Sequence, residues 1–263
     1  MTSGGFDFHT VDRTHVGRVR KLNEDRLISR PALGLWAVAD GMGGHQAGDL
    51  ASTMLVEALA DVAPLGSGYA FLDTVQESVQ RVNRTLVAHA RLSRPGTVIG
   101  STLVALLAYA GHYACLWAGD SRAYLLRQGR LEQITRDHSM VQEMIDSGAL
   151  NHADARTFGR SNVITRAVGV NDRLALDLHQ GPIQPGDLFL LCSDGLTTMM
   201  EDHEIADTLR REVPEDAADA LLRITLDRGA KDNISFILIR ADAAVDDTLR
   251  LQVAGDWPGP SFR

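Results

Sequence analysis

A carboxylate followed by a cluster of glycines is the feature that most constrains this chain. Residues 38–48 read VADGMGGHQAG, so that Asp40 ends an apolar run and is followed by four glycines and one histidine in eight positions. Glycine permits close backbone approaches that side chains forbid, and a carboxylate at the end of a strand is placed to hold a hard cation. The segment therefore predicts a site in which backbone and carboxylate oxygens surround a metal ion.

Size, charge and cysteine content limit what the chain can be. Its 263 residues, 44% of them apolar, can bury a large core, and we expect one domain over residues 1–240 and a polar tail over 241–263. The net charge of -8 argues against nucleic acid as the main partner, because proteins that bind it usually carry a basic face. Cys115 and Cys192 lie in apolar runs, which favours buried, reduced thiols. With no leader and no membrane-length apolar run, we expect a cytoplasmic protein.

The order of apolar patterns predicts an α+β fold. Short apolar runs predict strands at 35–39, 102–109, 113–118, 123–127, 187–192 and 234–239. Apolar residues at helical spacing predict helices at 47–61, 69–91, 139–147, 202–211 and 214–228. The three strands between residues 102 and 127 are separated by short turns, which indicates an antiparallel meander. We expect a four-layer α/β/β/α sandwich of two antiparallel sheets flanked by helix pairs.

Acidic residues recur where the predicted strands begin or end. Asp40, Asp120 and Asp194 follow apolar runs, Asp232 precedes the last run, and Glu24 and Asp25 lie in an early polar stretch. One Asp-Gly pair alone is an ordinary turn signal, but stacked sheets would bring the whole set to one edge. Carboxylates held so close would repel and resist ionisation unless divalent ions neutralised them. Oxygen ligands without a Cys or paired-His set favour magnesium or manganese over zinc.

Five short motifs follow one another in a fixed order along the chain. They are RKLNED at 20–25, VADGMGGH at 38–45, GDSRAY at 119–124, SDGL at 193–196 and KDNIS at 231–235. The set resembles the motifs of the PP2C-type (PPM) metal-dependent serine/threonine protein phosphatases over about residues 7–240. The resemblance implies two central antiparallel sheets, a two-metal centre of Mn2+ or Mg2+ with a possible third ion, and a flap at about 137–169. An irregular stretch at 151–162 is also what a functional flap would give.

The resemblance further assigns roles to single residues. Asp40 would bridge two ions, the carbonyl of Gly41 would bind one of them, Asp194 and Asp232 would bind the other, Asp120 would serve the third position, and Glu24 and Asp25 would act mainly through metal-bound waters. Two divalent ions that share a water lower its pKa, so that hydroxide can attack phosphorus in line near neutral pH.

Two further residues are candidates for catalysis. A guanidinium can hold two phosphate oxygens at once, so Arg20 is the candidate for binding the substrate phosphate; the alternative is a solvated arginine in a basic stretch. A protonated imidazole at His45 could donate a proton to the poorly leaving serine or threonine oxygen, or the residue could simply cap the glycine loop. Arg122, next to Asp120, is expected to form a structural ion pair.

These features predict a monomeric enzyme that removes phosphate from serine and threonine of phosphorylated proteins and opposes a bacterial Ser/Thr kinase. Two alternatives stay open, namely a catalytically silent phosphoprotein-binding module of the same fold and a hydrolase of small phosphate esters. Residues 34–49 and 141–143 also resemble small stand-alone bacterial enzymes that oppose a kinase controlling type VI secretion. The chain departs from the family pattern at Phe158-Gly159, where a His-Pro pair is common.

Overall fold

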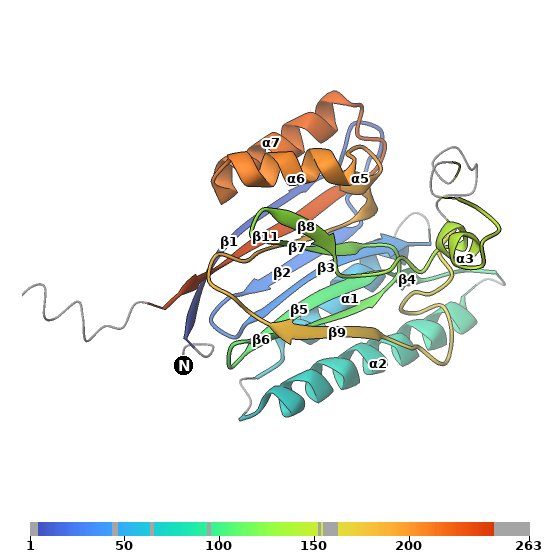
Figure 1. Cartoon of the computed structure of the whole chain (residues 1–263). Coiled ribbons are helices and arrows are strands. Elements are labelled where there is room, and N and C mark those ends of the chain that lie inside the picture. Colours follow the sequence, from blue (N-terminus) through green and yellow to red (C-terminus); the bar gives the residue numbers. More distant parts are fainter. Residues whose placement is uncertain are drawn as a thin grey trace, which may run out of the picture.

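Two antiparallel sheets lie face to face in the computed structural model, and helices cover both outer faces (Figure 1). The structure describes residues 5–43, 47–63, 66–93, 96–151, 154 and 163–244. The predicted α+β class and the four-layer α/β/β/α sandwich are confirmed.

One sheet has five strands in the order β1-β11-β10-β7-β8. They are β1 (Phe6–His15), β7 (Arg122–Arg127), β8 (Arg130–Gln133), β10 (Leu188–Cys192) and β11 (Ile234–Ala243). Helices α6 (Asp202–Arg211) and α7 (Pro214–Asp227) cover its outer face, and the short α5 (Asp194–Thr197) follows β10 (Figure 1).

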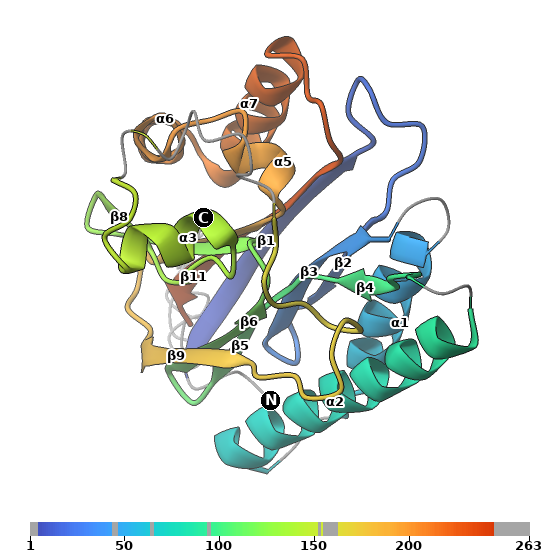
Figure 2. The same ribbon diagram turned by 90° about the vertical axis from the view of Figure 1, so that its right-hand side faces the viewer.

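The other sheet has six strands, five of them in the order β2-β3-β5-β6-β9, with β4 paired to β3. They are β2 (Asp25–Arg30), β3 (Leu35–Met42), β4 (Gly100–Ser101), β5 (Leu103–Tyr109), β6 (His112–Ala118) and β9 (Asp177–Pro182). Helices α1 (Ala47–Ala60) and α2 (Gly68–Leu92) cover this sheet, while α3 (Met140–Asp146) lies outside both helix pairs (Figure 2). Among the described residues, no helix is both long and apolar enough to cross a membrane.

Inner strands of both sheets are apolar on both faces, because helices cover one face and the opposite sheet covers the other. In β5, Leu103 and Leu107 pack toward α1 and α2, whereas Val104 and Leu106 pack into the layer between the sheets. In β10, Phe189 joins the same central layer. Side chains alternate from face to face along a strand, so continuous apolar runs are what a doubly covered strand requires.

The prediction of a meander through residues 102–127 is wrong at its third strand. Strands β5 and β6 form the expected antiparallel pair, but β7 pairs with β10 and β8 in the opposite sheet. The physical reason is that β9 occupies the free edge of β6. The chain therefore crosses between the sheets at residues 119–121, where Gly119 adopts a φ of 117°. This crossing places Asp120 between the two sheets.

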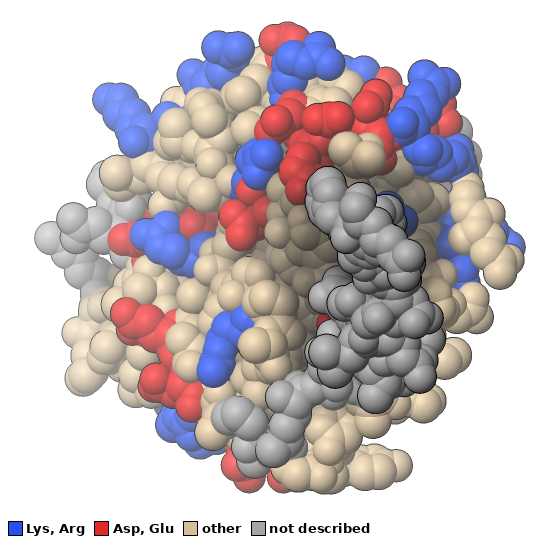
Figure 3. All heavy atoms as spheres, turned by 90° about the vertical axis from the view of Figure 1, so that its left-hand side faces the viewer, with Lys and Arg blue, Asp and Glu red and all other residues tan. Residues whose placement is uncertain are grey.

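The remaining predicted helices and strands are present, with ends displaced by a few residues. The sequence patterns do not predict strands β1, β2, β8 and β9. All four are half-exposed and form the edges of the two sheets. Strand β11 extends to Ala243, past the predicted boundary at 240, and residues 245–263 lie outside the described part of the chain. Both cysteines are buried and free, as predicted. On the coloured part of the face in Figure 3, basic and acidic side chains are interspersed.

Substitution of Gly195 tests the contact that joins α5 to β11. A Cβ at this position would lie 1.8 Å from the carbonyl oxygen of Asn233. Gly195→Ala should lower the free energy of unfolding by about 1–3 kcal/mol, because the backbone has to move to relieve the overlap. Gly66→Ala is the matched control, since nothing lies within 4 Å of a Cβ there. Equal denaturant midpoints for the two variants would contradict the close approach.

Candidate metal centre

Asp25 and Asp40 lie opposite each other on neighbouring strands. The antiparallel register of β2 and β3 pairs the two residues directly. Hydrogen bonds fix the backbone of Asp40, whose N–H donates to Thr102 Oγ1 at 3.1 Å and whose carbonyl accepts from Thr102 N at 2.8 Å. Strand pairing and Thr102 thus hold Asp40 of the predicted site in place.

The other sheet approaches this pair through Ser193, which immediately precedes Asp194. Ser193 Oγ donates to Asp25 Oδ2 at 2.9 Å and accepts from Ser235 N at 3.1 Å. Asp194 is the first residue of α5, directly after the buried strand β10. The Asp25 side chain of β2, Ser193 after β10 and the backbone of Ser235 in β11 therefore meet at one edge of the stack.

Arg20 and Asp232 form an ion pair beside these carboxylates. Arg20 Nη2 lies 2.7 Å from Asp232 Oδ2, and Asn233 N donates to Asp232 Oδ1 at 2.8 Å. The predicted phosphate-binding guanidinium therefore contacts a predicted metal ligand and stands where it offsets that negative charge. More than half of the Arg20 side chain is exposed, so the guanidinium is reachable from solvent.

Asn233 is a residue whose part in the site was not recognised from the sequence. Its Nδ2 donates to the carbonyls of Val16 and Leu22, both at 2.9 Å, and its Oδ1 accepts from Glu24 N at 2.9 Å. The side chain is buried and thus anchors the loop that carries Arg20 and Glu24. The sequence feature that points to Asn233 is a polar amide directly before a largely buried strand.

Gly41 and Gly48 bring the start of α1 onto the end of β3. A Cβ at Gly41 would lie 2.2 Å from Gly48 O, and a Cβ at Gly48 would lie 2.8 Å from Glu24 Oε1. The carbonyl of Glu24 accepts from Ser52 Oγ at 2.6 Å and from Gly41 N at 3.2 Å. The close backbone approach expected of the glycine cluster is confirmed at these two positions. Residues 44–46, including the candidate acid His45, and Phe158-Gly159 lie outside the described residues.

The carboxylates perturb one another strongly. Burial, followed by the charges of Asp120, Asp232 and Asp25, raises the pKa of Asp194 to about 8. The pKa of Asp40 is raised well above its usual range, first by burial and then by Asp25, Asp194, Asp120 and Asp232. Burial also raises the pKa of Asp25 to about 6. These acids are therefore close enough to oppose one another's ionisation.

The donor atoms fit a hard divalent cation. Glu24 Oε1 and Asp120 Oδ1 are buried and accept no hydrogen bond in the described part of the chain. Buried carboxylate oxygens without a partner are costly, and Mg2+ or Mn2+ satisfies them. Within the described ranges no three His, Cys, Asp or Glu side chains are already arranged to hold one ion.

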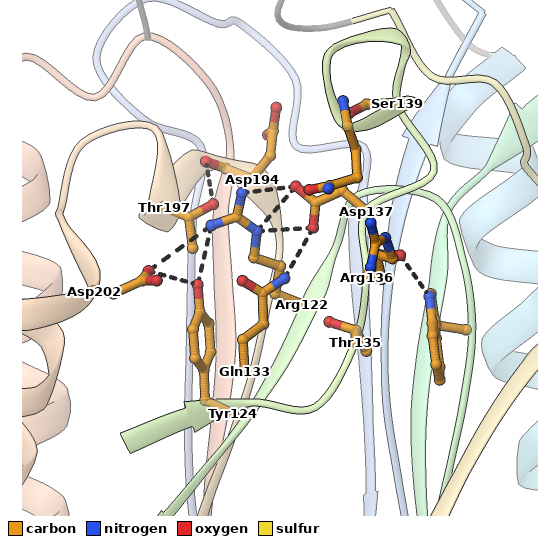
Figure 4. A network of polar contacts seen from close by, with 12 residues as sticks. Arg122, Tyr124, Gln133, Thr135, Arg136, Asp137, Ser139, Asp194, Thr197 and Asp202 are labelled. Atoms are coloured by element: carbon orange, nitrogen blue, oxygen red, sulfur yellow. Dashed lines mark hydrogen bonds and ion pairs between the residues drawn. The ribbon is translucent and has the colours of Figure 1, made fainter. Parts of the chain in front are cut away.

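A polar network is centred on Arg122, two residues after Asp120 (Figure 4). Arg122 donates to both carboxylate oxygens of Asp137, at 2.9 Å from Nε and 2.6 Å from Nη2. Its Nη1 also donates to Tyr124 Oη, which in turn donates to Asp202 at the start of α6. The expected structural ion pair of Arg122 is confirmed. It secures the segment that follows Asp120.

Comparison with known proteins agrees with this site. The model of the family Protein phosphatase 2C matches residues 17–234. The serine/threonine phosphatase stp of Listeria monocytogenes is 35% identical over 242 residues, which cover 89% of this chain and 96% of that protein. The serine/threonine protein phosphatase PstP of Mycobacterium tuberculosis is 33% identical over 226 residues, covering 86% of this chain and 43% of that protein.

Two solved structures are similar over nearly their whole length. PppA, described as a key regulatory component of T6SS in Pseudomonas aeruginosa, is 42% identical with a TM-score of 0.82, covering 89% of this chain and 97% of that one. The catalytic domain of PstP in complex with two manganese ions is 33% identical with a TM-score of 0.78, covering 89% and 98%. The chain therefore belongs to the protein phosphatase 2C family, the metal-dependent serine/threonine protein phosphatases.

Proposed function

We propose that the acidic cluster at the edge of the two sheets is the catalytic centre for hydrolysis of phosphoserine and phosphothreonine in proteins. The observation that carries this is the gathering of acids from both sheets, together with two buried carboxylate oxygens, Glu24 Oε1 and Asp120 Oδ1, that accept no hydrogen bond from the described residues. Asp40, the carbonyl of Gly41, Asp194 and Asp232 would hold two Mn2+ or Mg2+ ions. Asp120 would serve a third ion, and Glu24 and Asp25 would act through ordered waters.

The cations, when bound, would lower the pKa of a water molecule and offset charge on the phosphoryl oxygens. The protein groups position these parts. Arg20 can exchange its contact with Asp232 for two oxygens of the substrate phosphate, which a guanidinium suits geometrically. Thr102, Ser193 and Asn233 keep the acidic side chains and the Arg20 loop in place through the hydrogen bonds described above. His45 stays a candidate proton donor to the leaving oxygen.

We also propose that the protein is a monomeric, cytoplasmic enzyme that opposes a bacterial Ser/Thr kinase. Its support is the similarity to the serine/threonine phosphatase stp, 96% of which the match covers. The 42% identity to PppA supports control of a type VI secretion system as the setting. Residues 1–240, together with the last residues of β11 up to Ala243, would form the phosphatase domain, and the residues after them a tail.

Asp194→Asn tests the catalytic assignment. Phosphate release from a phosphothreonine peptide in Mn2+ should fall by more than roughly 100-fold, the upper end of what loss of a supporting residue around a metal causes. The metal-free variant should unfold at a denaturant concentration no lower than that of the parent, because one repelling charge is gone. Asp207→Asn, at an exposed position of α6, is the matched control. Unchanged phosphate release by Asp194→Asn would contradict the assignment.

The substrate class is tested by exchanging the phosphoester. Phosphopeptides should be hydrolysed faster than nucleotides and sugar phosphates at equal concentration, because the proposed site receives a protein side chain. The reverse order would favour the small-ester hydrolase. Binding of phosphopeptides without any phosphate release would favour the silent module.

The raised pKa values predict how pH acts on the metal-free protein. A carboxyl that binds its proton more tightly when folded stabilises the protein at low pH and loses that contribution as pH rises from its unfolded to its folded pKa. For Asp194 this window runs from 3.8 to about 8. In a chelator, the free energy of unfolding should therefore fall between about pH 5 and pH 8, and added Mn2+ should restore it. Asp194→Asn should show a shallower slope, and a parent protein that gains stability over this range would refute the prediction.

Arg20→Ala tests the phosphate contact. Loss of charge-assisted hydrogen bonds to phosphate should raise KM for the phosphopeptide by roughly tenfold or more. Lys21→Ala, the neighbouring cation on the same loop, controls for the general loss of a positive charge. Steady-state kinetics at saturating Mn2+ would measure both. A KM that rises equally in the two variants would show that only the charge of the loop matters.

A further inference from the structure

Residues 134–139, which we call the bracing segment, run alongside the turn that carries Asp120. Ile134 N donates to Ala123 O at 2.8 Å, and Ala123 N donates to Thr135 Oγ1 at 3.1 Å. Trp117 Nε1, on the other side of the turn, donates to Arg136 O at 2.8 Å. The bracing segment therefore contacts the chain both before and after residues 119–121.

His138 is the member of this segment that touches the turn itself. Its backbone N donates to Gly119 O at 2.9 Å, and Gly119 N donates to His138 Nδ1 at 3.1 Å. The buried ring stacks on Trp117 with 6.1 Å between ring centroids. Because Nδ1 accepts a hydrogen bond, a neutral ring carries its proton on Nε2.

The opposite ring nitrogen faces Asp177, the first residue of β9. His138 Nε2 lies 3.2 Å from Asp177 Oδ2, near enough for an electrostatic contact but not in hydrogen-bond geometry, and Asp177 also pairs with Arg166, which lies in the flap. The backbone joins the same two regions, since Thr165 N donates to His138 O at 2.8 Å and Met140 N donates to Val163 O at 2.9 Å. The chain that leaves at residue 139 thus returns to His138 before it enters β9.

The far side of the turn is closed by hydroxyl groups. Thr102 Oγ1 lies 2.7 Å from Ser121 Oγ and accepts from Asp40 N. A Cβ at Gly119 would lie 2.6 Å from the Cβ of Thr102. The turn therefore fits between Thr102 and His138, and a shift of the imidazole ring would release it on one side.

We propose that His138 is a positioning residue that, as the Nε2-protonated tautomer, holds the Asp120 turn through Nδ1 and faces Asp177, the ion-pair partner of Arg166 in the flap, through Nε2. One ring thereby contacts both the turn that carries a predicted metal ligand and the ion pair at the returning end of the flap. The effect of His138 on catalysis rests on the proposed function. Its geometry does not. Burial lowers the pKa of His138, which is consistent with a neutral ring.

Nuclear magnetic resonance of the 15N-histidine-labelled, metal-free protein tests the geometry without any activity. The His138 signals, identified by their absence from His138→Gln, should show an unprotonated Nδ1 and a protonated Nε2 at neutral pH. A ring protonated on Nδ1 would overturn the proposal, because Gly119 N could then not donate to it. This result is independent of whether the protein hydrolyses any substrate.

Two substitutions separate the two contacts. Asparagine places an oxygen where Nδ1 stands, so His138→Asn keeps the acceptor for Gly119 N but loses the contact with Asp177. Glutamine places an amide nitrogen near Nε2, so His138→Gln keeps the reach to Asp177 but loses the acceptor. His112→Asn, at an exposed histidine on β6, is the matched control.

In calorimetric titrations, His138→Gln should weaken Mn2+ binding at the weakest site, taken as the third position that Asp120 would serve, by roughly tenfold. This is the effect of about one lost hydrogen bond. Its KM for a phosphopeptide at saturating Mn2+ should stay near the parental value. His138→Asn should show the reverse, a parental Mn2+ titration with a raised KM. If both variants change both quantities equally, or change only the melting temperature, the ring is merely structural and the proposal falls. A parent protein without phosphatase activity would remove the proposed function, while the titration and the tautomer would still decide the role of His138.

Discussion

Repulsion among buried carboxylates is the constraint on which the site of this protein depends. Burial, followed by the charges of acids in the turn between β6 and β7, directly before β11 and in β2, raises the pKa of Asp194 at the start of α5 to about 8. A fold that served stability alone would separate such groups or pair each with a cation. Here Arg20 forms an ion pair with Asp232. The arrangement becomes favourable when divalent cations occupy it, which ties the architecture of the edge to metal chemistry.

The scaffold resists this repulsion through short, local contacts. Glycines at 41 and 48 let β3 and α1 approach until no Cβ would fit between them. Hydroxyl groups also stabilise the edge, because Ser193 donates to Asp25 across the two sheets while Thr102 accepts from the backbone of Asp40 within one sheet. Small polar residues suit these positions since they hydrogen-bond without adding volume. The apolar layer between the sheets then fixes the strands from which all of these residues project.

The sequence predicted the layers and the acidic edge because both follow from local patterns. Apolar runs marked the doubly covered strands, helical spacing marked α1, α2, α6 and α7, and acids at strand ends marked the site. Edge strands such as β1 were missed because half-exposed strands alternate apolar and polar residues and look like polar stretches. The place of β7 was missed because its partner depends on β9, which lies about 50 residues further along. No local pattern carries that information.

The same limit applies to the support of the site. Asn233 and His138 act through contacts with residues more than a hundred positions away or across the flap, so neither follows from spacing. Each satisfies backbone groups that regular sheet pairing leaves open, at the loop before β2 and at the turn after β6. Where the chain leaves a sheet to form a site, its backbone loses its partners, and a buried side chain has to supply them. Such side chains would position the proposed metal ligands without being ligands themselves, which makes them the places where cation binding and the position of the flap would influence each other.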